Sequence, residues 1–399
     1  MPASAPPADA RDSDTGAAGC ASQALPGIDA HPHARAVLAP ALGPHGSPSH
    51  AYLFHGPAGT GKRAVARAFA AALLREGARS PHTVAERVAR DCHPDLTWVR
   101  PSGAAEMLVA DIEEPVVAAA AHTPFESMRR VFVIEGADAM NDQAANRMLK
   151  VLEEPPAFTH LLLLADRPED VLATIASRCQ HVRFQPLPAQ LIAQRLQDAG
   201  GVDGERALAC ARLALGDAGW ARRLAGEEGE ALRAHAQELV RCAMQGETER
   251  RPWLGLLDAA RAAGTAAGER WQERMQGELE LVPSKERKRY EREGAEARRR
   301  GERRARTRTL EEALRLAELW LRDALCVREG APELVHAVDR RAQLERDAGQ
   351  HPAQALARGM ELIADARMSL AANVSEELAL EALAYRLQAV FDEHAPSAH

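Results

Sequence analysis

The residues best suited to chemistry form a glycine-rich loop near the start of the chain. Gly56-x-x-Gly59-x-Gly61-Lys62 follows a short apolar run and precedes an amphipathic one. Glycines let backbone N–H groups approach a polyphosphate, and a lysine at the start of a helix reaches its outer phosphates. The spacing therefore predicts a strand, a phosphate-binding loop and a helix.

The residue after the lysine departs from this pattern. A hydroxyl side chain normally stands there and holds Mg²⁺, whereas this chain has Arg63. A guanidinium cannot ligate a metal ion, and two like unit charges about 4 Å apart repel by roughly 4 kcal/mol near a protein surface. We expect the loop to bind ATP or ADP only weakly and to be poorly equipped for hydrolysis.

Strands and helices alternate around this loop. Residues 96–99, 130–134 and 161–165 are predicted strands, and the run at 130–134 is apolar throughout, as in a strand covered on both faces. Between the last two strands lies a predicted helix that Asn141 or Asp142 caps. This alternation predicts a parallel sheet with helices on both faces.

The composition is that of a helix-rich α/β protein. With 399 residues, 46% hydrophobic and 27% charged, the chain is too long for one ordinary core. It has no apolar run near the roughly 18 residues of a membrane span, and its N-terminus has no apolar signal core. Its six cysteines are scattered, as is typical of a reducing compartment. We expect a cytoplasmic protein without a membrane anchor.

Three motifs occur in an order that resembles one protein family. They are GPAGTGK at 56–62, VFVIEGADAMNDQAANRMLKVLEEPP at 131–156 and ATIASRCQHVRF at 173–184. They are similar to the AAA+ clamp-loader subunits of bacterial DNA polymerase III, and most of all to the delta-prime type. The resemblance covers residues 29–225 and continues more weakly to residue 387.

The resemblance implies a fold class and a domain order. The fold class is α/β, with an AAA+ P-loop parallel sheet, a small helical lid and an all-α collar through which subunits assemble. We expect a disordered leader at 1–27, the AAA+ domain at 28–186, the lid at 187–226 and the collar at 227–399. The apolar stripes of the collar helices are compatible with a plain core or a partner surface.

Four positions depart from the active members of this family. Active members place an Asp and a Glu after the third strand to guide Mg²⁺ and polarise water, and Glu135 and Gly136 stand there instead. Asp166 replaces a polar residue that senses the γ-phosphate, and Gly219 aligns with a lid arginine. With Arg63, these departures imply a degenerate nucleotide site that no longer hydrolyses ATP.

Ser177-Arg178-Cys179 is the motif with the sharpest functional implication. In the family its arginine enters a neighbouring subunit's nucleotide site as an arginine finger, which accelerates related reactions by about 10³ to 10⁵. Alternatively, Arg178 pairs with the last carbonyls of its own helix. We favour the finger. Cys179 is expected to be a small buried residue, because no His/Asp pattern accompanies it.

No metal site is expected. Many delta-prime and tau/gamma subunits carry a zinc module with four cysteines before the second strand, and only Cys92 remains here.

One segment of the chain is strongly basic. Residues 285–308 contain twelve Lys/Arg and five Asp/Glu, although the whole chain has a net charge of −7. This is either a cationic helix that contacts DNA or an exposed helix with Glu–Arg pairs at i,i+4 spacing. Tyr290 is its only aromatic residue, which disfavours base stacking. We favour the exposed helix.

Together these features predict a non-hydrolysing, delta-prime-like subunit of a DNA polymerase holoenzyme. Its partners would be the tau/gamma and delta subunits and, indirectly, the sliding clamp and primed DNA. Arg178 would serve a neighbouring ATPase. The alternatives are an active tau/gamma-type ATPase of the same complex and a DNA-binding module that uses the basic segment.

Overall fold

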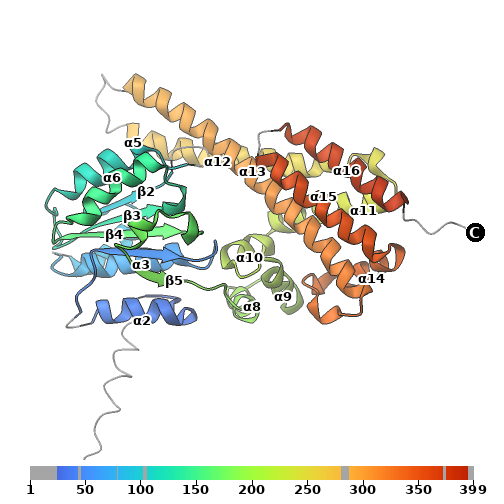
Figure 1. The fold of residues 1–399 in the computed structure, drawn as a ribbon, viewed down its shortest axis with the longest axis horizontal. Helices are drawn as coiled ribbons and strands as arrows, with labels where there is room; N and C mark the ends of the chain where they lie inside the picture. The colour runs from blue at the N-terminus through green and yellow to red at the C-terminus, as the bar shows by residue number, and fades with distance from the viewer. Residues whose placement is uncertain are drawn as a thin grey trace, which may run out of the picture. The chain divides into compact units, whose positions relative to one another are not determined.

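The computed structural model describes residues 25–43, 46–78, 80–101, 106–279, 287–371 and 374–393. The chain divides into two compact units, Met1–Leu187 and Pro188–His399, here called the N-terminal and C-terminal units (Figure 1). Most of the predicted leader lies outside the described residues. Its end does not, and Leu25 is fully buried in the core of the N-terminal unit.

The N-terminal unit is built on a five-stranded sheet in the order β2-β3-β4-β1-β5. The strands are β1 (Ala51–His55), β2 (Leu96–Val99), β3 (Arg130–Glu135), β4 (Thr159–Ala165) and β5 (Gln180–Arg183). Every neighbouring pair is parallel. The carboxyl ends of all five strands therefore meet at one edge of the sheet, where the loops after β1, β3 and β4 lie together.

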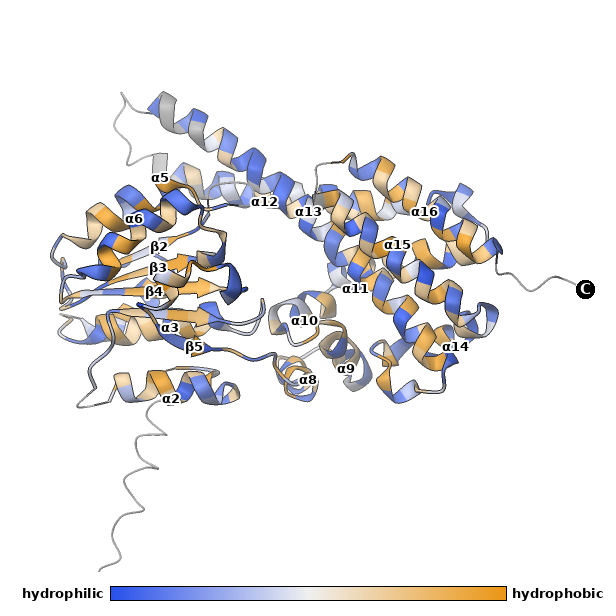
Figure 2. Ribbon diagram, in the orientation of Figure 1, coloured by the Kyte–Doolittle hydropathy of each residue, from blue (hydrophilic) through white to orange (hydrophobic). Residues whose placement is uncertain are grey.

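Helices cover both faces of this sheet. One face packs against α2 (Pro32–Ala41), α3 (Lys62–Arg75) and α4 (Pro81–Ala89). The other packs against α5 (Val109–Ile112), a π-helical turn (Glu113–Ala118), α6 (Asp142–Glu153) and α7 (Ala173–Ala176). The side chains of β1, β3 and β4 alternate between the two cores, and these strands are accordingly apolar along most of their length (Figure 2).

Two details show how the sequence sets these elements. Asn141 is the N-cap of α6, where its Oδ1 accepts a hydrogen bond from the Ala144 N–H at 2.9 Å, as expected. The helix after β2, in contrast, changes to π-helical geometry at residues 113–118. This stretch contains Pro115, which has no N–H to donate to the preceding turn.

The described residues of the C-terminal unit form helices and turns and contain no strand. Its helices are α8 (Ala189–Asp198), α9 (Gly204–Leu213), α10 (Ala218–Ala225), α11 (Glu227–Met244), α12 (Trp253–Leu279), α13 (Arg287–Arg328), α14 (Arg341–Gln350), α15 (Ala353–Ala371) and α16 (Glu376–Glu393). The predicted fold class, a P-loop parallel sheet followed by helical parts, is confirmed. Within the described chain, no helix is long and apolar enough to span a bilayer.

Candidate functional site

The glycine-rich loop lies between β1 and α3 at the carboxyl edge of the sheet. Gly56, Gly59 and Gly61 all have positive φ angles, of 139°, 72° and 93°. A Cβ atom at Gly56 would collide with the carbonyl oxygen of Phe184. The loop therefore has the conformation of a phosphate loop, and it requires glycine at this first position.

The amino group of Lys62 is already fully engaged. This buried side chain donates to the carbonyl oxygens of Gly56 and Pro57, the latter at 2.7 Å. Its Nζ also lies 2.8 Å from Oδ1 of Asp166, at the end of β4. An ammonium group has three donors, so these contacts use its whole capacity. A phosphate group would have to displace at least one of them.

Arg63 forms an ion pair with the acid that ends β3. Its guanidinium lies 2.7 Å from Oε2 of Glu135, and Trp98 Nε1 donates to Oε1 of the same carboxylate at 2.5 Å. Arg100 Nε is 3.4 Å from that oxygen. The Glu135 side chain is only 5% exposed, whereas that of Arg63 is 74% exposed. The carboxylate that would guide Mg²⁺ is thus neutralised from within the chain, and the site does not fit a magnesium ion.

The position of the missing base is occupied by a glycine in the left-handed conformation. Gly136 has φ 73°, and a Cβ atom there would lie 3.0 Å from Cγ of Pro101. The nearby Asp138 does not substitute for a base, because its Oδ2 accepts the backbone N–H groups of Asp166 and Arg167 at 3.1 and 3.0 Å. Asp138 holds the turn after β4, and this role was not predicted.

Gly219, which the motif aligns with a lid arginine, lies in the first turn of α10. Asp217 is the N-cap of this helix and accepts the Trp220 N–H at 2.7 Å. The alignment of Gly219 with an arginine stays a prediction.

Arg178 lies on the surface of the N-terminal unit, after α7. Its two terminal nitrogens contact the Thr174 carbonyl oxygen at 3.0 Å and Oε1 of Glu153 at 2.8 Å. Its side chain is 37% exposed. The helix-capping contact expected as an alternative is therefore present. The guanidinium is nevertheless not sealed in a core, and a role at a neighbouring subunit stays a prediction.

The cysteines follow the expected pattern where the structure describes them. Cys179 is buried, and burial raises the pKa of its thiol to about 12, which is unsuitable for a nucleophile. Cys92 is exposed. Among the described residues, no three His, Cys, Asp or Glu side chains gather as a metal site would require. The absence of zinc remains an expectation.

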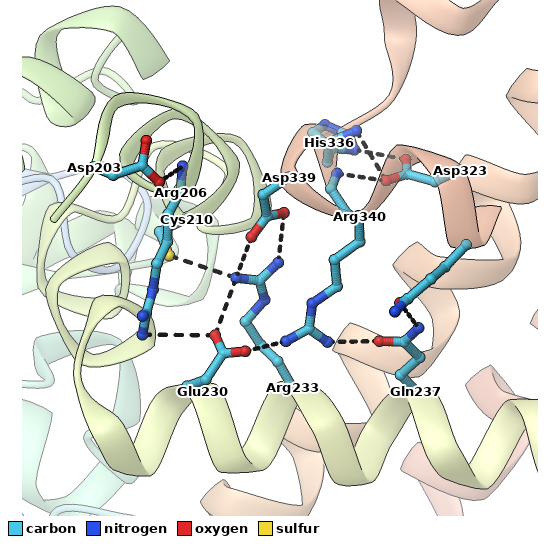
Figure 3. A network of polar contacts seen from close by, with 12 residues as sticks. Asp203, Arg206, Cys210, Glu230, Arg233, Gln237, Asp323, His336, Asp339 and Arg340 are labelled. Atoms are coloured by element: carbon cyan, nitrogen blue, oxygen red, sulfur yellow. Dashed lines mark hydrogen bonds and ion pairs between the residues drawn. The ribbon is translucent and has the colours of Figure 1, made fainter. Parts of the chain in front are cut away.

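A polar network in the C-terminal unit joins α9, α11 and the turn at Val338–Arg340 (Figure 3). Arg233 on α11 makes two hydrogen bonds to the carboxylate of Asp339, at 3.0 and 2.9 Å. Glu230, one turn before it, contacts Arg340 and, at 3.6 Å, Arg206 of α9. The Arg233 side chain is 3% exposed. Burial alone would lower the pKa of Arg233, but its bonds to Asp339 raise it overall, so the guanidinium stays charged.

A second buried acid organises a loop that sequence reasoning missed. Asp95 is fully buried and accepts backbone N–H groups from Phe125, Glu126 and Ser127, at 2.5, 3.0 and 2.9 Å. The only signal in the sequence is an acid placed just before a strand. The N–H groups that Asp95 binds are some 30 residues further along the chain, and no local sequence pattern specifies them.

The N-terminal unit is similar to a known protein family. Residues 36–188 match the family described as DNA polymerase III, delta subunit. Subunit delta' from Pseudomonas aeruginosa is 36% identical over 210 residues, which cover 50% of this chain and 63% of the relative. Subunit delta' from Bacillus subtilis is 38% identical over 154 residues, which cover 37% of this chain and 46% of the relative.

The tau/gamma type of subunit matches over a smaller share of its length. The gamma/tau subunit from Mycobacterium tuberculosis is 34% identical over 161 residues, which cover 39% of this chain and 28% of the relative. This chain thus spans less than two thirds of the length of the relatives compared. The predicted resemblance is confirmed: this chain is related, through its N-terminal unit, to the delta-prime subunits of bacterial DNA polymerase III.

Proposed function

We propose that this protein is a non-hydrolysing, delta-prime-like subunit of a DNA polymerase III clamp loader. In this role it helps a ring of related ATPases place the sliding clamp on primed DNA, in the cytoplasm. Its partners are tau/gamma and delta subunits. It requires no cofactor of its own, binds ATP or ADP weakly at most and holds no zinc.

The observation that carries this proposal is the internal pairing of the nucleotide site. The two cations that would face phosphate and metal are paired with acids of the same site, Lys62 with Asp166 and Arg63 with Glu135. Metal-assisted hydrolysis needs an open metal position and a residue that orients water, and Gly136 supplies no side chain for the second task. The similarity to subunits named delta' supports the same conclusion.

The remaining contribution to catalysis is the guanidinium of Arg178, offered in trans. It is exposed at the surface and held by Glu153 and the Thr174 carbonyl. A guanidinium in this position would stabilise the charge that develops on a neighbour's γ-phosphate. When a neighbouring subunit binds, Arg178 would leave its exposed ion pair with Glu153 and contact the phosphate. This exchange would cost little free energy, because exposed ion pairs contribute about 0–1 kcal/mol.

Clamp loading by a reconstituted complex tests this role. The measurement is the rate at which sliding clamp is placed on primed DNA, with wild type, Arg178→Ala or Glu153→Gln as the subunit. We expect Arg178→Ala to slow loading strongly and Glu153→Gln to leave it near wild type, because the latter removes the ion pair but keeps the guanidinium. Equal effects of the two variants would assign Arg178 a structural role within its own chain.

The alternative is an active ATPase of the tau/gamma type. It predicts steady-state ATP turnover by the isolated chain that disappears in Lys62→Ala. The proposal predicts no turnover above background in either protein.

A further inference from the structure

The short helix α7 ends just before Arg178, and its last turn is tightened. In a continued α-helix the Arg178 N–H would donate to the Thr174 carbonyl oxygen, four residues back. It donates instead to that of Ile175, at 3.1 Å, and the Cys179 N–H donates to that of Ala176 at 3.2 Å. Both bonds span three residues, as in a 3₁₀ turn. The tightening thus draws the backbone donor away from the carbonyl group of Thr174.

Two side chains donate to this carbonyl group. The Ser177 hydroxyl group donates to the Thr174 oxygen at 3.1 Å, and Nη1 of Arg178 donates to it at 3.0 Å. Carbonyl groups at the end of a helix are satisfied in this way by side chains, or by water. Arg178 is also the residue proposed to leave this position for a neighbour's phosphate. Once the guanidinium has left, the hydroxyl group of Ser177 keeps the Thr174 oxygen hydrogen-bonded.

A third side chain holds the next exposed carbonyl group. Nε2 of His181 donates to the Ala176 oxygen at 3.1 Å. The imidazole ring lies edge-on to that of His55, the last residue of β1, with 5.3 Å between the ring centroids. A ring nitrogen that donates to a carbonyl oxygen carries a hydrogen, so this bond persists when the other nitrogen is protonated. The contact therefore links the end of α7 to the sheet.

The same segment is fixed from its inner side by apolar contacts. Ile175 and Cys179 are buried in one core of the N-terminal unit, and they stand on either side of Arg178 in the sequence. The side chains of Ser177, Arg178 and His181 are exposed. The buried residues thus anchor both ends of the turn, and the exposed hydrogen bonds hold the carbonyl groups between them.

We propose that Ser177 and His181 are positioning residues for Arg178, an inference that rests on the proposed function. They keep the turn after α7 in place while the guanidinium moves from Glu153 and the Thr174 carbonyl group to a neighbour's γ-phosphate. Neither residue touches the phosphate. A displacement of about 1 Å at a reacting group can slow a reaction by about 10²-fold. A turn that loosened when the guanidinium left would therefore weaken the contact that Arg178 makes.

Hydrogen exchange of the isolated full-length chain tests the capping itself. Arg178→Ala imitates the turn after the guanidinium has left. We expect Ser177→Ala/Arg178→Ala to exchange the amides of residues 178 and 179 about fivefold faster than Arg178→Ala, because the Thr174 oxygen then loses its second side-chain donor. Ser177→Ala alone should change these rates less, because Arg178 still donates. Equal rates in Arg178→Ala and the double variant would overturn the role of Ser177.

ATP turnover by a reconstituted clamp loader, with clamp and primed DNA, tests the positioning role. We expect Ser177→Ala and His181→Leu each to slow the affected site about three- to tenfold. Ser177→Thr and His181→Gln keep a donor and should retain most of the rate. The matched controls are Thr83→Val and His82→Leu, at exposed positions of α4. Thr83→Val removes a bond of the same kind, from Oγ1 to the Ser80 carbonyl oxygen at 3.1 Å, and both controls should leave turnover unchanged.

The Arg178→Ala background separates positioning from general stability. Residues that act only through Arg178 have nothing left to position there, so Ser177→Ala and His181→Leu should lower turnover no further. A further loss of the same size would assign both residues to the stability of the unit and overturn the inference. Wild-type turnover in both single variants, with Arg178→Ala slow, would also overturn it and leave the proposed function intact. Wild-type turnover in Arg178→Ala itself would overturn the proposed function and this inference together.

Discussion

The guanidinium of Arg63 lies 2.7 Å from the carboxylate of Glu135, the acid that ends β3. A fixed cation of the chain thus faces the acid that would guide Mg²⁺. Together with Trp98, Arg63 gives this buried carboxylate its partners from within the chain.

Removal of this internal counterion should destabilise the N-terminal unit. In Arg63→Ser the buried Glu135 carboxylate keeps Trp98 and the more distant Arg100 but loses its shortest ionic contact. We expect a loss of about 1–2 kcal/mol in the free energy of unfolding by urea, because a buried acceptor loses a partner. Arg90→Ser, at an exposed arginine, is the matched control and should cost under about 0.5 kcal/mol. Equal stability of Arg63→Ser and wild type would show that the pair contributes nothing.

Restoration of the missing base should also have a structural cost. Gly136→Glu forces a side chain into a left-handed conformation and against Pro101. We therefore expect the free energy of unfolding to fall by more than about 1–2 kcal/mol. Gly200→Glu is the control, because Gly200 has a similar φ of 85° but a Cβ atom there would meet nothing within 4 Å. The difference between the two variants in urea unfolding measures the contact with Pro101. A smaller loss for Gly136→Glu than for the control would refute this explanation.

The link between α11 and the turn at Val338–Arg340 should depend on the Arg233–Asp339 pair. Arg233→Met removes the partner of Asp339, whose side chain is only 15% exposed. We expect the free energy of unfolding to fall by about 3–5 kcal/mol. The double variant Arg233→Met/Asp339→Leu should recover part of the lost stability, because it leaves no buried charge without a partner. Arg223→Met, which breaks the more exposed Arg223–Glu312 pair, should cost at most about 1 kcal/mol. Equal losses for the two single variants, in unfolding followed by circular dichroism, would mean that burial of the pair is unimportant.

The stability of the N-terminal unit should fall in mildly acidic solution. Burial lowers the pKa of His160, whose Nδ1 donates to the Ser49 carbonyl oxygen at 2.9 Å. Since the unfolded chain then binds the proton more readily, stability is full above the ordinary histidine pKa of about 6.5 and is lost as the pH falls below it. The slope contributed by one such histidine is at most about 1.4 kcal/mol per pH unit.

The variant His160→Asn keeps a donor for Ser49 and removes the titration. It should flatten the dependence of the unfolding free energy on pH below about 6.5, while His122→Asn, at an exposed position, should leave the curve unchanged. A variant with the same curve as wild type would exclude His160 as a source of the acid sensitivity.

The sequence was sufficient to predict the sheet, its flanking helices and the departures at Arg63 and Gly136, because these depend on local patterns and motif spacing. It did not predict what replaces the lost groups. The pairs of Arg63 with Glu135 and Lys62 with Asp166 depend on how three strands bring their carboxyl ends together.

Long-range polar contacts were also beyond sequence reasoning. Arg233 and Asp339 are 106 residues apart, and neither stands in a pattern that distinguishes it from the many surface charges of the chain. The basic segment is a similar case, because its sequence does not indicate which acid each arginine contacts. Only the structure shows that Arg298 pairs with Glu302 and that Arg306 pairs with Glu376, 70 residues away.

The most direct test of the central claim is steady-state ATP turnover by a reconstituted clamp loader in the presence of clamp and primed DNA. Two variants of this chain are compared, Lys62→Ala in its own nucleotide site and Arg178→Ala at its surface. The account predicts that Lys62→Ala leaves turnover near wild type, whereas Arg178→Ala lowers it, with the affected site slowed by about 10³ or more. Turnover that depends on Lys62 and not on Arg178 would contradict it.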